Sequence, residues 1–211
     1  MQARVFAVIL SVAIVPPVVV CADQTPAPLP VIGRTRANTL CKTVREVVAP
    51  AVRDLMNVDR LLAQSRTVYA EMADHSRLRQ NLDRVSLGKI VVGMARDLSA
   101  VQTLVDDPKR FPKSATTEED RLALQLRQEL RTVAERDSRA LDIVNGVLET
   151  DLMAQMIGGL PRAPVYGGTG RFYSRVADAV AEHQTDIGHA EADLAAAVVA
   201  ASTACGGDAA P

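Results

Sequence analysis

Aromatic residues are scarce in this chain of 211 residues, which contains no Trp, three Tyr and three Phe. Surfaces that bind nucleic acids or sugars use exposed rings for stacking, and the few scattered rings here do not form such a platform. Neither charge is in excess, because the formal net charge is −1 at pH 7. This balance excludes a basic nucleic-acid-binding tail, and a hydrophobic content of 48% excludes a disordered chain.

Strand-like alternation of useful length is also missing, as is any repeat of fixed period. Ala, Val and Leu instead recur at helical spacing, which predicts an all-α fold. The clearest heptad lies near the C-terminus and predicts one buried stripe, made of Phe172, Val176, Ala179, His183, Ile187, Ala190, Leu194, Ala197 and Ala201.

Residues 1–22 have the features of a secretory signal peptide. A short basic start is followed by an apolar run over residues 5–20, which Pro16 and Pro17 interrupt. This run is shorter than the roughly 20 apolar residues of a membrane-spanning helix, so we expect cleavage after Ala22. An uncleaved membrane anchor and a lipoprotein acylated on Cys21 remain as alternatives. The protein is thus expected to be exported to the periplasm, the cell envelope or the extracellular space.

Removal of Cys21 with the signal peptide leaves Cys41 and Cys205, one near each end of the remaining chain. An even number of cysteines in an exported protein predicts a disulfide bond between them. Two unrelated free thiols are the alternative. A catalytic cysteine is less favoured, since no His or acidic residue has an evident pairing with either.

The rest of the chain predicts one helical domain over residues 34–206. A Pro-rich extended leader, residues 23–33, precedes it, and a disordered tail, residues 207–211, follows it. Pro50 should kink the first helix, because proline removes one backbone hydrogen bond and clashes with the preceding turn. Four long helices are expected, over residues 35–73, 77–106, 117–157 and 171–204.

The break between the first two of these helices rests on two observations. The apolar stripe loses its register after Met72, beside the polar run 74–77, with 86–88 as a second candidate for the turn. Three antiparallel helices would also place Cys41 and Cys205 at opposite ends, whereas four place them at the same end. The prediction is therefore an antiparallel up-down-up-down four-helix bundle, closed by the Cys41–Cys205 disulfide.

Only one cluster suggests chemistry. Asp186 and His189 are three residues apart on the last helix, a spacing similar to the Glu-x-x-His pairs of carboxylate-bridged di-metal bundles. His183 and Glu71 could complete a metal site, but no second pair of this kind exists in the sequence. A solvated or structural cluster is the favoured interpretation, and no catalytic residue or cofactor is predicted.

The expected function is therefore non-enzymatic: a cell-envelope scaffold or partner-binding module that recognises an unidentified protein. Nucleic acid is not an expected partner, and membrane contact is expected only through an uncleaved signal or a lipid anchor. The alternative is a ferritin-like bundle that binds a small ligand or a metal through the acids and histidines of the last helix. Convergence of His183, Asp186 and Glu71 in the core would favour that alternative.

Overall fold

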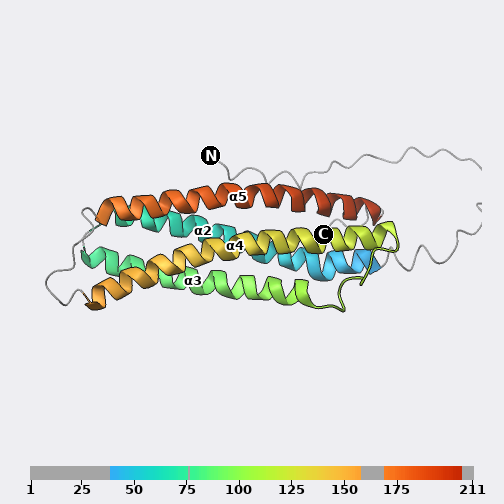
Figure 1. Cartoon of the computed structure of the whole chain (residues 1–211), viewed down its shortest axis with the longest axis horizontal. Coiled ribbons are helices and arrows are strands. Elements are labelled where there is room, and N and C mark those ends of the chain that lie inside the picture. The colour runs from blue at the N-terminus through green and yellow to red at the C-terminus, as the bar shows by residue number, and fades with distance from the viewer. Residues whose placement is uncertain (1–38, 76, 158–168, 206–211) are drawn as a thin grey trace, which may run out of the picture. The chain divides into compact units, whose positions relative to one another are not determined.

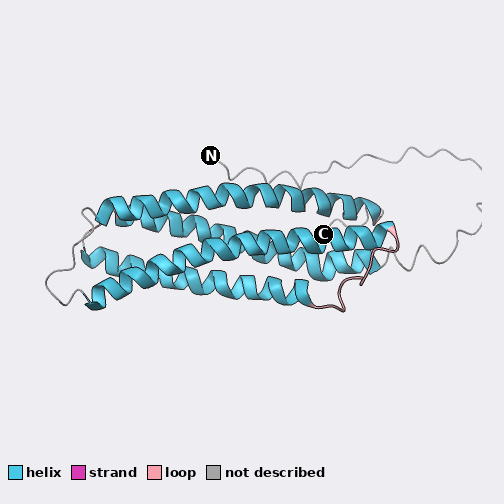
Figure 2. Ribbon diagram, in the orientation of Figure 1, coloured by secondary structure: helices cyan, strands magenta, loops and turns pink. Residues whose placement is uncertain are grey.

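Four long helices pack together in the computed structural model, which describes residues 39–75, 77–157 and 169–205 (Figure 1). They are α2 (Ala49–Met72), α3 (Arg77–Asp106), α4 (Glu118–Ile157) and α5 (Thr169–Ala204). No strand occurs in these three ranges, so the expected all-α class is confirmed (Figure 2). All of them belong to one compact unit, Ile32–Pro211. The predicted signal peptide, leader and tail lie outside the described residues.

The helices form the predicted up-down-up-down bundle. α2 packs against α3 and α5, and α4 packs against the same two neighbours, so that α3 and α5 lie diagonally opposite each other (Figure 1). Nearly the whole core is aliphatic. Tyr69 is the largest side chain that is fully buried, and its hydroxyl donates a hydrogen bond of 2.9 Å to the Val144 carbonyl across the bundle.

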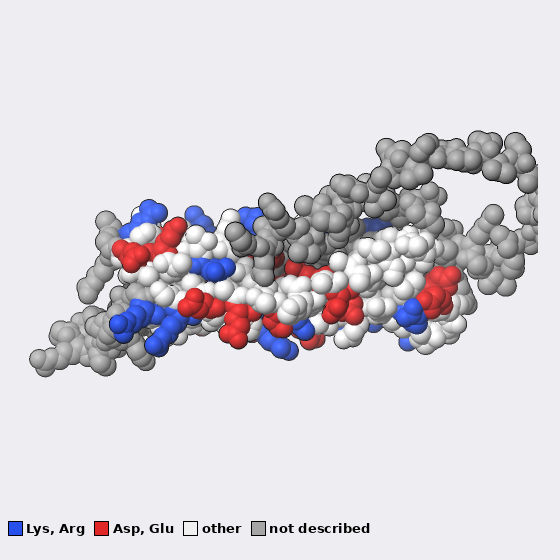
Figure 3. All heavy atoms as spheres, turned by 90° about the horizontal axis from the view of Figure 1, so that it is seen from above, with Lys and Arg blue, Asp and Glu red and all other residues white. Residues whose placement is uncertain are grey.

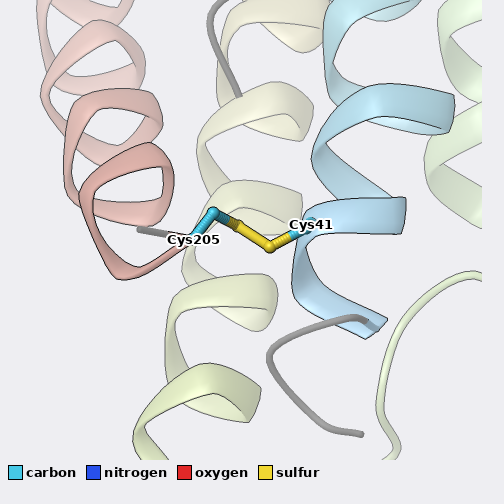
Figure 4. The surroundings of a disulfide bond; sticks show 2 residues. All are labelled: Cys41 and Cys205. Atoms are coloured by element: carbon cyan, nitrogen blue, oxygen red, sulfur yellow. A yellow bond between two sulfur atoms is a disulfide. The ribbon is translucent and has the colours of Figure 1, made fainter. Parts of the chain in front are cut away.

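The predicted disulfide is present (Figure 4). Cys41 lies in the helical segment 39–43 at the start of the bundle, and Cys205 directly follows α5. Their Cα atoms lie 5.7 Å apart although 164 positions separate them in sequence. An even number of helices brings both ends of the bundle together, as the cysteine argument required.

Pro50 is accommodated by a local change of helix type. The segment η2 (Val44–Val48) is π-helical, and the amide of Ala49 donates to the carbonyl of Val44, five residues earlier. Pro50 then occupies the first turn of α2, directly after the π-helical segment. Such single-turn π-segments are a recognised cause of helix bending, so the irregularity expected at Pro50 takes this form.

The turn between α2 and α3 contains neither glycine nor proline and is held by polar side chains. Nε2 of Gln80 donates to the carbonyls of Met72 and His75, at 3.0 and 3.1 Å. Nδ1 of His75 lies 2.7 Å from Oδ2 of Asp83. Gln80 and Asp83 are both buried. The first turn of α3 therefore provides donors for the carbonyl groups of Met72 and His75 at the end of α2.

The connection to α4 ends at a capped helix start. Oγ1 of Thr117 accepts a hydrogen bond of 3.2 Å from the amide of Asp120, in the first turn of α4. Arg127, in α4, contacts the segment that precedes this helix. Its guanidinium lies 5.3 Å from the centre of the Phe111 ring, and its Nε donates a hydrogen bond to the Val105 carbonyl. These contacts hold the connecting segment against the ends of α3 and α4.

The buried stripe of α5 differs in part from the predicted heptad. The prediction is correct from Ile187 onward, but nearer the N-terminus the core contains Tyr173 and Val180, while Phe172 and His183 are only half-buried. Tyr173 lies two full heptads before Ile187 and therefore occupies the same heptad position, whereas Phe172 lies one residue earlier. The predicted stripe takes two four-residue steps in a row, from Ala179 to His183 and on to Ile187, which shifts part of its N-terminal half by one residue, although Val176 is buried as predicted.

Candidate functional site

The structure does not bring the four residues considered for a metal site together. Glu71 and His189 are exposed, and His183 is half-buried. Asp186 is exposed and pairs with the guanidinium of Arg136 on α4 at 3.0 Å. Across the described ranges, no group of three or more His, Cys, Asp and Glu side chains is arranged to hold a metal ion.

A different set of acids faces the core. Asp59 on α2, Asp137 on α4 and Glu191 on α5 interact electrostatically with one another. Asp137 is 1% exposed, and its Oδ1 atom has no hydrogen-bond partner among the residues that the structure describes. Asp59 and Glu191 are half-buried. We call these three residues the carboxyl cluster.

Burial dominates the protonation of the carboxyl cluster. Loss of solvent, together with the smaller effect of the charges of Glu191 and Asp59, raises the pKa of Asp137 to about 8. Burial also raises the pKa of Glu191 to about 7. The pKa of Asp59 is raised by burial and is partly lowered by a hydrogen bond with Gln184. At neutral pH Asp137 is therefore mostly protonated, and the cluster exchanges protons near physiological pH.

Asp137 is the functional candidate that the sequence interpretation missed. On α4 the apolar residues at helical spacing include Val133 and Ala140, and no apolar residue occupies the position between them in this spacing. Asp137 occupies the position in this gap, four residues after one and three before the other. An acid at an interrupted core position was the available signal.

A second polar network lies near the C-terminal end of α4. Arg84 on α3 donates from Nε and Nη2 to both carboxylate oxygens of Asp151, and its Nη2 also lies 3.2 Å from the Tyr173 hydroxyl. Only 9% of the Arg84 side chain and 16% of the Asp151 side chain are exposed. This bidentate pair links α3, α4 and α5, and every group in it has a partner, which is typical of a structural network.

The solvent side of α3 combines aliphatic and basic residues. We define the α3 face as Arg79, Leu82, Val85, Lys89, Val92 and Arg96, all of which are exposed. Leu82, Val85 and Val92 are 57%, 59% and 70% exposed, respectively. The acids of this stretch, Asp83 and Asp97, are buried instead. From residue 79 to residue 103, α3 exposes no acidic side chain.

The solvent side of α5 has the opposite character. We define the α5 face as Asp178, Glu182, Gly188, Ala192, Asp193 and Ala196, all of which are exposed. No Lys or Arg occurs in α5 after Arg175. Acidic side chains predominate along the middle of the side of the bundle that carries α5 (Figure 3). Within the described residues, Asp178, Glu182 and Asp193 form no ion pair.

Among the described helices, none is both long enough and apolar enough to cross a membrane. Comparison with protein-family models, with curated protein sequences and with solved structures gives no significant match. The functional argument therefore rests on the surfaces and the core of this chain.

Proposed function

We propose that this protein is an exported, non-enzymatic bundle that works by binding a protein partner through the α3 face. The observation that carries the proposal is the exposure of Leu82, Val85 and Val92 on one side of one helix. At 3.6 residues per turn, these three side chains lie within an arc of about 80°. Clustered large aliphatic side chains on a helix surface are typical of a site where another helix docks.

The electrostatics of α3 support binding to an acidic partner. Asp83 and Asp97 turn inward, where they pair with His75 and Arg96 respectively. Lys89 lies between the exposed aliphatic residues, so the α3 face combines apolar surface with positive charge. A complementary partner presents small or apolar side chains together with carboxylates.

Two features support export. The N-terminal 22 residues have the pattern of a signal peptide. The Cys41–Cys205 bond is the kind of cross-link that persists in oxidising compartments and is rare in the cytosol. Intact mass measurement of the protein recovered from the producing cell tests this part, because cleavage after Ala22 predicts a defined new N-terminus.

The α3 face is tested by site-specific photocrosslinking in the native cell envelope. A photoreactive residue at Val92 or Val85 is expected to give a discrete protein adduct, whereas the same residue at Gln128, an exposed position on α4, is the control. Lys89→Glu combined with the probe at Val92 should abolish the adduct. Equal labelling at Val92 and Gln128 would contradict the proposal.

The alternative of a metal-binding bundle has less support. The residues that it required, His183, Asp186, His189 and Glu71, do not form a ligand group among the described residues. The carboxyl cluster is inward-facing, but it too lacks an arrangement that could hold a metal.

A further inference from the structure

The α3 face and the α5 face have complementary properties and lie on diagonally opposite helices of the bundle (Figure 1). From this pairing we infer that the partner bound by the α3 face is a second copy of this chain, which contributes its α5 face. The inference rests on the proposed function and names the partner of the same surface. It predicts a heterologous contact, in which the α3 face of one copy lies side by side with the α5 face of another.

Charge supports this pairing. The α3 face carries Arg79, Lys89 and Arg96, and the α5 face carries Asp178, Glu182 and Asp193. Arg79 and Arg96 also pair with buried acids of their own helix, Asp83 at 3.7 Å and Asp97 at 2.7 Å, but both arginine side chains remain exposed. At a rise of 1.5 Å per residue, the basic row spans about 25 Å and the acidic row about 22 Å. Two helices aligned side by side can therefore bring bases and acids into register along most of both rows. Contact between two α3 faces would instead oppose like charges.

Shape supports it as well. Leu82, Val85 and Val92 project from α3, whereas the α5 face has little side-chain bulk at Gly188, Ala192 and Ala196. Thr185 and His189 are the larger side chains exposed on the same side of α5. A helix of small residues lets a bulkier helix approach closely, so the aliphatic side chains of α3 have a surface to pack against. Val199, which is also exposed, extends the apolar part of α5.

The remaining titratable groups on this side of α5 are compatible with the contact. His189 is exposed among the acids, and Asp186 is already paired with Arg136. The bases Arg171 and Arg175 lie before Asp178, at the opposite end of the helix from Ala196. They leave the stretch from Asp178 to Asp193 without a positive side chain on α5.

Contact between two different faces is heterologous, so it leaves one α3 face and one α5 face free at the ends of every assembly that has not closed into a ring. Because the faces lie on diagonally opposite helices, using one does not cover the other. Assembly is therefore expected to continue beyond a dimer, as a ring or a short filament. Screening by salt should weaken it, because the rows of opposite charge contribute to the attraction.

Charge reversal in two variants tests the inference. The first variant is Lys89→Glu with Arg96→Glu, and the second is Glu182→Lys with Asp193→Lys. Analytical ultracentrifugation of the disulfide-bonded protein should show concentration-dependent oligomers for the native chain and monomers for each variant alone. Mixing the two variants should restore association, because each reversed face then meets a face of opposite charge.

Circular dichroism and thermal melting of each variant show whether it is folded, and Glu135→Lys, at an exposed position on α4, serves as a charge-reversal control outside both faces. An α3–α3 dimer would respond to the first variant alone, which would overturn the pairing. A native chain that stays monomeric at all accessible concentrations would also overturn it. In that case an adduct at Val92 with a different protein would still support the proposed function, so the two failures are distinguishable.

Discussion

Cys41 and Cys205 join the first helical residues of the bundle to the residue that follows its last helix, with Cα atoms 5.7 Å apart. The bond closes a loop with a sequence separation of 164. It therefore restricts the unfolded chain far more than it restricts the folded bundle, whose ends already meet.

Cys41→Ser combined with Cys205→Ser should lower the free energy of unfolding by about 5 kcal/mol, the chain-entropy value for a loop of this length. Urea denaturation of the native and doubly substituted proteins measures the change. Addition of a reductant should destabilise the native protein to the same extent and leave the variant unchanged. Free thiols that react with an alkylating agent at both positions of the native protein would contradict the prediction.

Asp137→Asn should change the pH dependence of stability. The pKa of Asp137 rises to about 8 in the folded state, so the folded protein holds this proton while the unfolded chain loses it near pH 4. Stability of the native protein should therefore fall as pH rises from about 4 to about 8 and then level off. The variant lacks this loss. Between about pH 5 and pH 9, its free energy of unfolding should therefore rise relative to that of the native protein by on the order of 3 kcal/mol.

Asp142→Asn, at an exposed position on the same helix, is the matched control and should follow the native profile. Chemical denaturation across the pH range measures all three proteins. Part of the native slope should persist in Asp137→Asn, because the pKa of Glu191 also rises, to about 7. Parallel profiles for the native protein and Asp137→Asn would exclude a buried, titrating Asp137.

Arg84→Met should lower the free energy of unfolding by about 3 kcal/mol, because it leaves the Asp151 carboxylate mostly buried without its cation. Adding Asp151→Leu should recover part of the loss, since the double substitution removes both charges. Thermal or urea unfolding of the two single variants and the double variant forms a double-mutant cycle. Strictly additive effects would show that the pair contributes no coupling energy.

Gly146→Ala should stabilise the protein by about 0.5–1 kcal/mol, because a helical glycine has excess freedom in the unfolded chain. A Cβ atom at this position would meet nothing within 4 Å. At Gly93 a Cβ would lie 2.9 Å from Cδ1 of Leu61, so Gly93→Ala should stabilise the protein clearly less than Gly146→Ala does. Leu61→Ala in the Gly93→Ala background should reduce that difference. Equal gains at the two glycines in urea denaturation would show that α2 and α3 are not closely packed there.

The helices and their number followed from local information. Apolar residues at helical spacing specify which side of each helix is buried, and this pattern is strong in a chain that has few aromatic residues to obscure it. The loss of register after Met72 and the positions of the two cysteines then required an even number of helices. The loss of register and the positions of the cysteines can both be read from the sequence, without knowledge of how the helices pack.

The register within a helix was less predictable. Phe172 and Tyr173 are neighbours of similar size, and Tyr173 is the one that lies two full heptads before the buried Ile187. The presence of Arg84 and Asp151 beside it, from two other helices, gives its hydroxyl a polar environment. Such partners are remote in sequence, so periodicity alone does not identify them.

The sequence by itself determined an all-α chain, its division into four helices and the pairing of its cysteines, because these depend on spacing along the chain. Only the tertiary structure decided which charged side chains meet. Asp59, Asp137 and Glu191 come from three helices and interact in the core, whereas Asp186 and His189, close in sequence, remain at the surface. The physical reason is that burial and charge proximity depend on how the helices are rotated against one another.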